Sequence, residues 1–401
     1  MIKEGPSISV DVSKSGVTYQ GWLSYGKPHG KARKADMTRT GLSAIKALAD
    51  DLGAKDGVVV PVAYEDTGIY SKPLRMFLSE SGMVEAVMSP LLSAKVRKAD
   101  DKPIKTDMRD CASIAEAYYT KDKVRIAAPT VGQDALKQLS KSHQTRKAEL
   151  RKTKERFRKN LDEVWPFWDS VFADPYRNGP WAMVSKYRHP YVLARKRKAD
   201  VVALLEANGI HGKRADAMAE KAIAYAKDCV SGALESSPEV ESLGRWMAGV
   251  ESAAAEDAAV MGKMVAMLEG NRDFEHLKEI RGIGASLAAI IVAELGDAFR
   301  FGSAKAVVSY AGLNPMVCQS GKMTGRHLPI TKKGNARLRW ALVMAVRVMG
   351  LTDADNKVTR FRDHLINENR LSSEAAIVAA SSKLLRIIYS MMKSGQPFEQ
   401  D

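Results

Sequence analysis

Two aspartates three residues apart, Asp107 and Asp110, are the side chains of this sequence whose types and spacing first suggest chemistry. A spacing of three places both carboxylates on one face of a helix, and Thr106 is a suitable N-cap, so we predict that a helix begins here. The amide dipoles of a first helical turn favour negative charge, and a divalent cation could offset the remaining repulsion. An ordinary acidic first turn on a solvated helix is the alternative.

Two further acids lie where the sequence predicts strands. Asp11 is on the polar face of an alternating run, and Glu65 follows a strongly apolar run. If these acids converge with Asp107 and Asp110, they form the cluster that two-metal phosphoryl transfer needs. Hard cations take oxygen ligands and hold both the attacking and the leaving oxygen of an in-line displacement. Without that convergence each acid is a solvated surface residue.

A serine among cations forms the second candidate centre. Ser320 stands in a Gln-Ser-Gly stretch of the segment 312–340, which is rich in basic residues. A serine beside a flexible glycine could attack a phosphodiester, while the cations stabilise the extra charge of the transition state. A hydrogen-bonding turn residue is the alternative. The basic residues that we expect to contact nucleic acid here are Lys322, Arg326, Lys332, Lys333, Arg337 and Arg339.

The composition describes a folded and strongly basic protein. With 401 residues, of which 45% are hydrophobic, the chain can form two or three domains with buried cores. The formal net charge of +15 indicates a polyanionic partner, most simply nucleic acid, because Lys and Arg release counterions from a phosphate backbone. A membrane surface would explain the charge equally well.

The sequence predicts no membrane segment. No apolar run approaches the roughly 20 residues that a spanning helix needs, and the start MIKEGPSISV lacks the apolar stretch of a signal peptide. We therefore expect a soluble, cytoplasmic protein. The three cysteines have no paired spacing, which argues against a disulfide framework or a zinc site.

The elements that must position the first acids alternate between strands and helices. A turn at Ser15-Gly16 predicts an opening hairpin, and Gly53 ends a helix with apolar spacing. Pro61 argues against a fully paired central strand. The pattern is typical of an α/β domain with acids where strands end. The predicted strands are 8–13, 17–25, 58–64 and 83–89, the predicted helices are 42–52 and about 69–80, and a basic stretch intervenes at 27–34.

A long basic helix is predicted from residue 131. Seam positions recur every seven residues, but the companion column is mostly polar, so the coiled-coil seam is half built. The excess of cations favours nucleic-acid contact through Lys147, Arg151, Lys154 and Arg158, with a solvated face as the alternative. The seam residues are Leu136, His143, Leu150, Phe157 and Val164.

A second long helix, opened by Ser237-Pro238-Glu239, is predicted as the antiparallel or intersubunit partner of the first. Its apolar set keeps coiled-coil spacing from Leu243 through Ala254 and Ala258 to Leu268. Between the two long helices, residues 165–195 are rich in Trp and Pro and predict a packed connector. Residues 197–230 predict a pair of helices broken at Asn208-Gly209.

The C-terminal part contains a glycine hairpin. Gly282 and Gly284 stand between two helices within 277–295, an arrangement that resembles the helix-hairpin-helix motif, in which backbone amides approach a phosphate closely. A simple helical turn is the alternative. An apolar helix beginning at Gly334-Asn335 and a second one at 371–395 would form the core of this part.

Taken together in order and separation, these motifs resemble those of a known family. They are VDVSK with Asp11, E-x-T-G from Glu65, KTDMRDC with Asp107 and Asp110, the Gly-Ile-Gly hairpin, and GLNP…QSG…KKGNARLRW with Ser320. The sequence is similar to insertion-sequence transposases with a DEDD acidic tetrad and a C-terminal catalytic serine. These are also called bridge recombinases and are related to pilin-gene inverting recombinases. Cys111 stands where an alanine is more usual in the family.

The resemblance implies a fold of α/β plus α class. It implies a ribonuclease H-like, resolvase-like DEDD domain at 1–128, a coiled-coil and helical linker region at 129–270, and a helical transposase domain with the helix-hairpin-helix and the serine at 271–401. The tetrad of Asp11, Glu65, Asp107 and Asp110 would bind Mg²⁺, and Ser320 would form a transient phosphoserine link with DNA. Strand exchange would then proceed through a Holliday junction.

The implied partners are donor and target DNA, a structured non-coding bridge RNA, and further copies of the chain, as a homodimer assembling into a tetramer. Two other interpretations stay open. A metal-dependent Holliday-junction resolvase-like nuclease or DNA invertase would use the tetrad alone, and a basic coiled-coil protein would bridge nucleic acid without catalysis.

Overall fold

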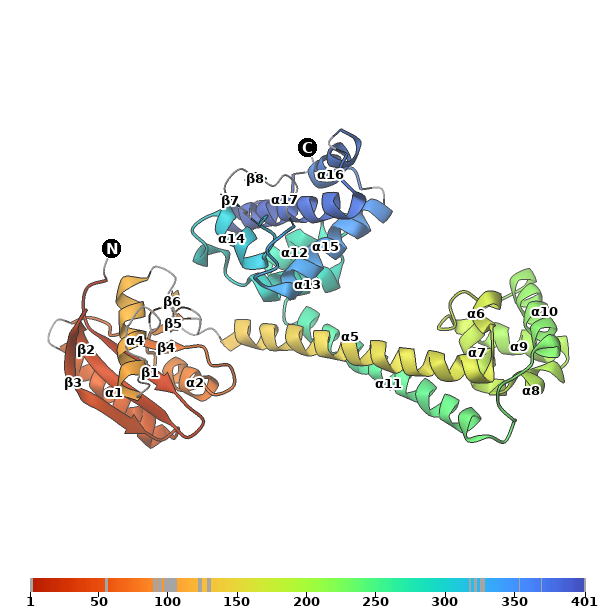
Figure 1. The fold of residues 1–401 in the computed structure, drawn as a ribbon, viewed down its shortest axis with the longest axis horizontal. Coiled ribbons are helices and arrows are strands. Elements are labelled where there is room, and N and C mark those ends of the chain that lie inside the picture. The colour runs from red at the N-terminus through yellow and green to blue at the C-terminus, as the bar shows by residue number, and fades with distance from the viewer. Residues whose placement is uncertain are drawn as a thin grey trace. The chain divides into compact units, whose positions relative to one another are not determined.

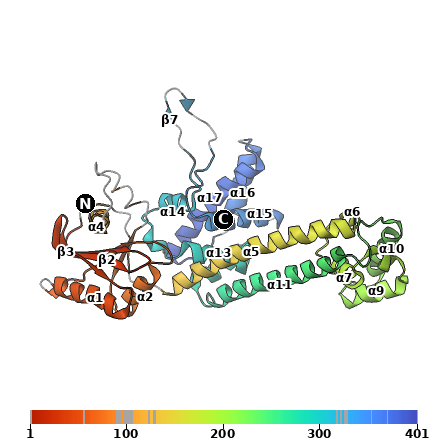
Figure 2. The same ribbon diagram turned by 60° about the horizontal axis from the view of Figure 1, so that its bottom comes forward.

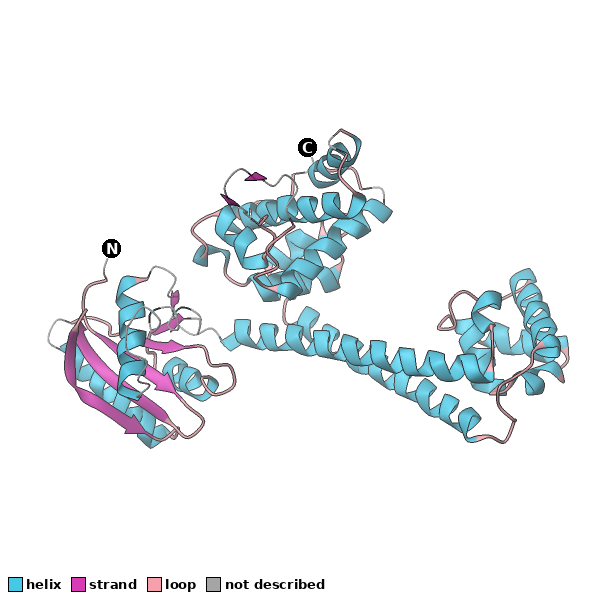
Figure 3. Cartoon of the chain, viewed as in Figure 1, coloured by secondary structure: helices cyan, strands magenta, loops and turns pink. Residues whose placement is uncertain are grey.

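The computed structural model of this chain describes residues 3–54, 57–88, 92, 96, 107–121, 125–127, 131–316, 319–320, 323–324, 329–352, 354–368 and 370–399. Two compact units are present, unit 1 at Met1–Ala135 and unit 2 at Leu136–Asp401 (Figure 1). The sheet belongs to unit 1, whereas unit 2 is helical apart from short strands (Figure 3). The sequence-predicted domain limits at 128 and 270 stay predictions.

Unit 1 is built on a mixed sheet. Within its described residues the sheet has six strands in the order β3-β2-β1-β4-β5-β6. The first three pair antiparallel, β1 runs parallel to β4 and β4 to β5, and β6 closes the far edge antiparallel. This order is consistent with a ribonuclease H-like fold. The strands are β1 (Ser7–Val12), β2 (Val17–Ser24), β3 (Lys27–Ala35), β4 (Val62–Glu65), β5 (Glu85–Met88) and β6 (Arg125–Ala127).

Helices cover both faces of this sheet (Figure 1). Helices α1 (Arg39–Ala54) and α2 (Lys72–Glu80) pack with Ile8, Val10 and Tyr64, while α4 (Asp107–Thr120) packs with Ala63 on the opposite face. Because successive strand residues point to opposite faces, the odd-numbered residues of β1 and β4 face α4. The predicted hairpin and helices of this unit are confirmed, as are the strands predicted at 8–13, 17–25 and 83–89, which form β1, β2 and β5.

Two sequence predictions about strands need correction. Pro61 lies directly before β4, which begins at Val62, and its carbonyl accepts a 3.0 Å hydrogen bond from the Ile8 amide. The proline therefore shortens the predicted strand 58–64 instead of interrupting it. The basic stretch 27–34 is not a connector but edge strand β3, whose side chains are mostly exposed. Backbone pairing with β2 makes this strand, so the side-chain pattern gave no indication of it.

Unit 2 contains the two long helices. Most of α5 (Val131–Val164) lies in it, and α11 (Pro238–Ala266) runs antiparallel beside it (Figure 2). Arg146 Nη1 lies 2.7 Å from Glu256 Oε2 in the C-terminal half of α11. Phe157, further along α5, shares a core with Leu243 near the N-terminal end of α11. The predicted antiparallel pairing within one chain is therefore confirmed.

A cluster of short helices caps the far end of this helical pair. Its core contains the fully buried Phe157, Trp165 and Trp168. Residues 165–195, predicted as a packed connector, are largely helical, because Pro180 and Pro190 stand in the first turns of two helices, where proline is tolerated. The predicted pair at 197–230 is confirmed. The cluster comprises α6 (Trp168–Val171), α7 (Asn178–Tyr187), α8 (Pro190–Ala194), α9 (Lys198–Ala207) and α10 (Lys213–Asp228).

The C-terminal part of unit 2 is a helical bundle around α13 and α17. Among the described residues, only α17 is long and apolar enough to span a membrane, and half of its apolar window is buried in this core. The elements are α12 (Arg272–Lys278), α13 (Ala285–Leu295), η1 (Ala298–Arg300), α14 (Ala304–Ala311), β7 (Gln319–Ser320), β8 (Met323–Thr324), α15 (Ala336–Leu351), α16 (Lys357–Asn367) and α17 (Ser373–Ser394).

The middle of the α5/α11 pair is polar. Ala254 and Ala258, predicted in the seam, are exposed, because Asp257 of α11 faces α5 in their place. The Asp257 Oδ1 atom lies 2.6 Å from Nδ1 of the buried His143. A straight α-helix has 3.6 residues per turn, so positions seven residues apart gradually rotate away from the face that contacts the partner helix. Burial lowers the pKa of His143 and outweighs the attraction of Asp257, which raises it.

This pair makes the stability of unit 2 depend on pH. Because His143 has a lowered pKa in the folded state, the unfolded chain binds its proton more readily, and the free energy of unfolding should fall by roughly 1 kcal/mol as pH drops from 7.5 to 5.5. Urea unfolding followed by tryptophan fluorescence measures this. His143→Gln should remove that part of the slope, and the exposed control His211→Gln should keep it. An equal slope in both variants contradicts the assignment.

Candidate functional site

The first two acids lie side by side on the sheet. Strands β1 and β4 pair in parallel, with Val10 opposite Tyr64. Asp11 and Glu65 each follow that pair by one residue, so they lie next to each other on neighbouring strands, on the face that α4 covers. Neighbouring strands are about 4.8 Å apart. Glu65 is buried at the end of β4 and Asp11 is half-buried.

The start of α4 lies over the same face. Cys111 Sγ donates a 3.2 Å hydrogen bond to the carbonyl of Thr18, the residue paired with Asp11 across the hairpin. Burial, together with the negative charges of Asp11 and Asp110, raises the pKa of the Cys111 thiol to about 12. Asp110 is itself buried. The thiol is thus a packing group, and both carboxylates act on it electrostatically.

Three of the four predicted acids, Asp11, Glu65 and Asp110, therefore lie on the same face of the sheet, which we call the acidic face of unit 1. Asp107 is the first residue of α4, but its side chain and Thr106 lie outside the described residues. Among the side chains that are described, no three of His, Cys, Asp or Glu meet closely enough to hold a metal ion. The donors are all carboxylate oxygens, which is the ligand set that Mg²⁺ prefers.

Another buried acid of unit 1 does not belong to this face. Glu85 in β5 accepts hydrogen bonds from the Tyr64 hydroxyl at 2.5 Å and from Arg75 at 2.9 Å. Tyr64 packs in the core on the α1/α2 side of the sheet. Glu85 is therefore a compensated structural charge on the opposite face.

The second candidate centre is only partly described. Ser320 ends the short strand β7, and its side chain lies outside the described residues, as do Lys322 and Arg326. The base of this segment is closed by a 2.9 Å hydrogen bond from the Met316 amide to the Pro329 carbonyl and by a bridge between Pro315 and Ile330. The segment is thus held at both ends on the C-terminal bundle.

A buried carboxylate anchors the start of α15, on the C-terminal side of the Ser320 segment. Glu294 in α13 accepts hydrogen bonds from Asn335 Nδ2 at 2.6 Å and from Ser140 Oγ of α5 at 2.5 Å, and it forms an ion pair with Arg337. Burial raises the pKa of Glu294, but these three donors outweigh it and hold the pKa below its usual value. Our sequence analysis missed this residue, although an acid inside the apolar run AAIIVAEL indicates a buried partner.

The same contacts define the role of the nearby predicted cations. Arg337 is tied to Glu294, and Arg339 Nη1 donates to the carbonyl of Ala311 at 2.9 Å. Lys332 and Lys333 are exposed. The two arginines therefore have structural partners, and the contact of all four with nucleic acid stays a prediction.

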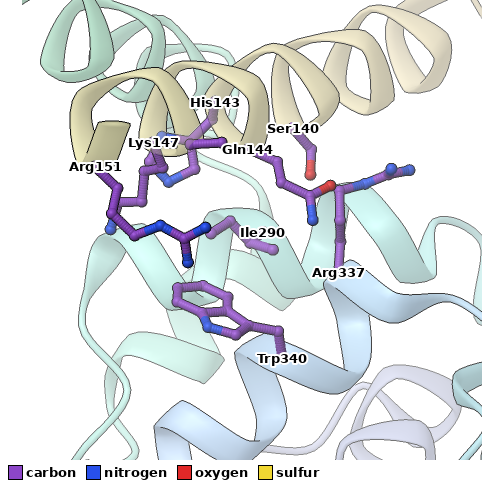
Figure 4. A pocket seen from close by; sticks show the side chains of 9 residues that line it. Ser140, His143, Gln144, Lys147, Arg151, Ile290, Arg337 and Trp340 are labelled. Carbon is purple, nitrogen blue, oxygen red and sulfur yellow. The ribbon is translucent and has the colours of Figure 1, made fainter. Parts of the chain in front are cut away.

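The four predicted cations of α5 fall into two pairs. Lys154 lies over the Tyr176 ring at 4.4 Å and Arg158 pairs with Asp169 at 2.8 Å, so both belong to the helical cluster. Lys147 and Arg151 are exposed and line a pocket beside Trp340 of α15 (Figure 4). Their contact with nucleic acid also stays a prediction.

The two glycines of the predicted hairpin differ in their surroundings. Gly282 has a φ of +99°, which favours glycine, and a Cβ built on it would lie 2.6 Å from Met349 Cγ. Both the backbone conformation and the packing therefore require glycine at this position. Gly284 is the N-cap of α13, and a Cβ built on it would meet no atom within 4 Å. Of the two, Gly284 has open space for a close approach by phosphate, and its contact with DNA stays a prediction.

The Glu294 cluster predicts a large stability effect. Replacing Glu294 by alanine leaves the half-buried Arg337 without its counter-charge and the donors of Ser140 and Asn335 without their acceptor, so the free energy of unfolding should fall by about 3 kcal/mol. The exposed Glu269→Ala is the matched control and should change it by less than about 0.5 kcal/mol. Urea denaturation of the full chain measures both. Similar midpoints for the two variants would show that the cluster does not stabilise unit 2.

Comparison with known proteins gives two family matches in the order expected from these centres. Residues 8–166 match the model of the DEDD transposase domain of IS110, described as "Transposase". Residues 274–360 match the model of the "Transposase IS116/IS110/IS902 family". The first match contains the acidic face, and the second contains Ser320 and Glu294.

Whole-length relatives agree with these matches. The chain is 24% identical to the uncharacterized 43.6 kDa protein of insertion element IS110 from Streptomyces coelicolor, over 88% of this chain and 87% of that protein. It is 23% identical to the corresponding 44.8 kDa protein of IS116 from Streptomyces clavuligerus, over 73% and 72%. It is also 31% identical to the pilin gene-inverting protein of Moraxella bovis, over 31% of this chain and 38% of that protein. The chain therefore belongs to the IS110/IS116 family of transposases, whose members are DNA-cleaving enzymes.

Proposed function

We propose that this transposase cuts and rejoins DNA with two centres, a Mg²⁺-binding acidic face and the Ser320 hydroxyl. The observation that carries the proposal is the meeting of Asp11, Glu65 and Asp110 on one face of the sheet. Like charges gathered on one face favour the binding of a cation, and carboxylate oxygens are the ligands that a hard cation takes. The DEDD domain suggests a divalent metal ion, typically Mg²⁺.

The residues of unit 1 would hold the metal through carboxylate oxygens. Asp11 and Glu65 come from neighbouring strands, and Asp110 from the first turn of α4, with Asp107 completing the set. When bound, Mg²⁺ would stabilise negative charge on a DNA phosphate. Rigid strands and a helix start fix the positions of the acids before DNA binds, which reduces the reorganisation that reaction requires.

Ser320 would supply the nucleophile. Its oxygen would form a bond to phosphorus while the bond from phosphorus to a sugar oxygen breaks, and the proton lost by the serine would be matched by one taken up by the leaving oxygen. Exposed Lys332 and Lys333 would attract the phosphate backbone near this residue. The Glu294 cluster positions the segment through Asn335.

The partners we propose are donor and target DNA, a structured bridge RNA, and copies of the chain as a homodimer assembling into a tetramer, in the cytoplasm. The net charge of +15 supports the polyanionic partners. The guide RNA and the assembly rest on the resemblance to the family. Inversion of DNA is a second candidate reaction, favoured by the match to a pilin gene-inverting protein over 126 residues.

The acidic face is tested by single substitutions. Asp110→Asn removes a ligand charge and should lower Mg²⁺-dependent strand cleavage by about 100-fold or more, because even outer partners of metal ligands are worth 10- to 100-fold. DNA affinity and melting temperature should change little. The exposed Asp50→Asn in unit 1 is the matched control. Full cleavage by the Asp110 variant would remove this residue from the site.

Ser320 is tested by trapping a covalent intermediate on a nicked suicide DNA substrate. The native chain should form a denaturant-resistant protein–DNA adduct, and Ser320→Ala should form none while still binding DNA. Ser309→Ala, an exposed helical serine in the same bundle, should form the adduct normally. An adduct in the Ser320 variant would place the nucleophile elsewhere, and cleavage without any adduct would favour a metal nuclease.

A further inference from the structure

Unit 2 contains a pocket of about 440 Å³ between α5, α13 and α15 (Figure 4). Its walls are formed by Gln144, Lys147 and Arg151 of α5, Ile290 of α13, and Arg337 and Trp340 of α15. Pockets of 300 to 1,000 Å³ commonly hold ligands of small-molecule size. The pocket is thus large enough for one nucleotide but not for a duplex.

The indole of Trp340 is the unusual feature of this pocket. Its neighbours Leu338, Ala341 and Leu342 are fully buried in the bundle, whereas Trp340 is 43% exposed on the outer side of α15. Figure 4 shows its ring below Arg151 and beside Ile290. Single exposed aromatic side chains are common on protein surfaces, but this indole forms a wall of a concave pocket and offers a flat apolar face to a ligand there.

The remaining walls are polar and cationic. Lys147 Nζ lies 5.6 Å from the centre of the Trp340 ring. Arg151 is exposed, and its pair with Glu155 at 3.6 Å is open to solvent and therefore weak. The charge of Arg337 is compensated by Glu294 behind the pocket. None of the described residues lining the pocket is acidic. The site therefore attracts an anion that also carries an aromatic group.

We propose that this pocket binds one unpaired nucleotide of a single-stranded nucleic acid. The base stacks on Trp340 and covers Ile290, the amide of Gln144 can pair with a base edge, and Lys147 and Arg151 bind the flanking phosphates. Aromatic platforms with cationic rims hold single strands in this way, whereas the bases of a duplex are already stacked. The inference rests on the proposed nucleic-acid function, and it assigns α15 a binding role separate from cleavage.

Binding of the full chain to fluorescently labelled 12-nucleotide probes tests the pocket. The probes are single-stranded oligo-uridine, single-stranded oligo-thymidine and a DNA duplex. Trp340→Ala should weaken single-strand binding about 5- to 150-fold and leave duplex binding unchanged. Trp340→Phe should restore most of the lost single-strand affinity. Loss with one single-stranded probe alone assigns the nucleotide to RNA or to DNA, and loss with both means that either polymer binds.

Phe299→Ala is the matched control, because Phe299 is also exposed and also has a lysine, Lys393, over its ring at 4.5 Å. It should leave all affinities unchanged. Replacing both Lys147 and Arg151 by Gln should make the negative slope of log affinity against log salt concentration shallower, by about 0.7 for each residue replaced. Unchanged single-strand affinity in Trp340→Ala, or an equal loss with the duplex, overturns the proposal.

Two measurements keep the outcome decisive. Ultraviolet crosslinking of 5-bromouridine or 5-bromodeoxyuridine probes to the native chain, followed by peptide mapping, should label Trp340, and labelling elsewhere alone contradicts the pocket even if the variant fails to fold. Adduct formation by Trp340→Ala on suicide DNA separates the two hypotheses. Normal adducts with unchanged single-strand binding overturn the pocket only. Trp340-dependent binding by a native chain that forms no adduct overturns the cleavage mechanism only.

Discussion

The organisation of unit 2 depends on one carboxylate surrounded by donors. Glu294 lies at the end of an otherwise apolar helix, where an uncompensated charge would be strongly destabilising. Compensation requires Ser140 from α5, and Asn335 and Arg337 from the start of α15, to be present at the same time. The long helix, the bundle and the end of the Ser320 segment are therefore fixed by the same group. The apolar core supplies most of the stability, and this cluster selects how the helices are arranged.

Unit 1 is under a different constraint, because it must bring like charges together. The parallel register of β1 and β4 places Asp11 and Glu65 side by side, and the alternation of strand side chains gives both acids the same face. The α4 helix brings Asp110 to that face while Cys111 packs against the backbone of β2. These like charges on one face favour, as we propose, the binding of a cation.

Local patterns predicted much of this architecture. The alternation around Asp11 and the helix start at Asp107 are encoded by adjacent residues, so the strands, helices and acids could be located. The edge strand β3 could not, because backbone pairing with β2 makes it and its side-chain pattern does not indicate a strand. The Glu294 cluster and the Trp340 pocket could not, since each depends on partners that are far apart in the sequence. The inward placement of Asp257 instead of Ala254 and Ala258 shows the same limit, because helical drift and a distant histidine decide it.

The edge strand β3 has a consequence for how copies of this chain can associate. Among the described strands it lies at the rim of the sheet, and outer backbone groups at such a rim are the usual template for uncontrolled strand addition between molecules. The strand carries Lys27, Lys31, Arg33 and Lys34 on exposed positions. Two such rims brought together would face each other with like charges, so sheet extension and fibril-like aggregation are disfavoured. Any contact between copies of this chain is thereby directed to surfaces other than the sheet rim.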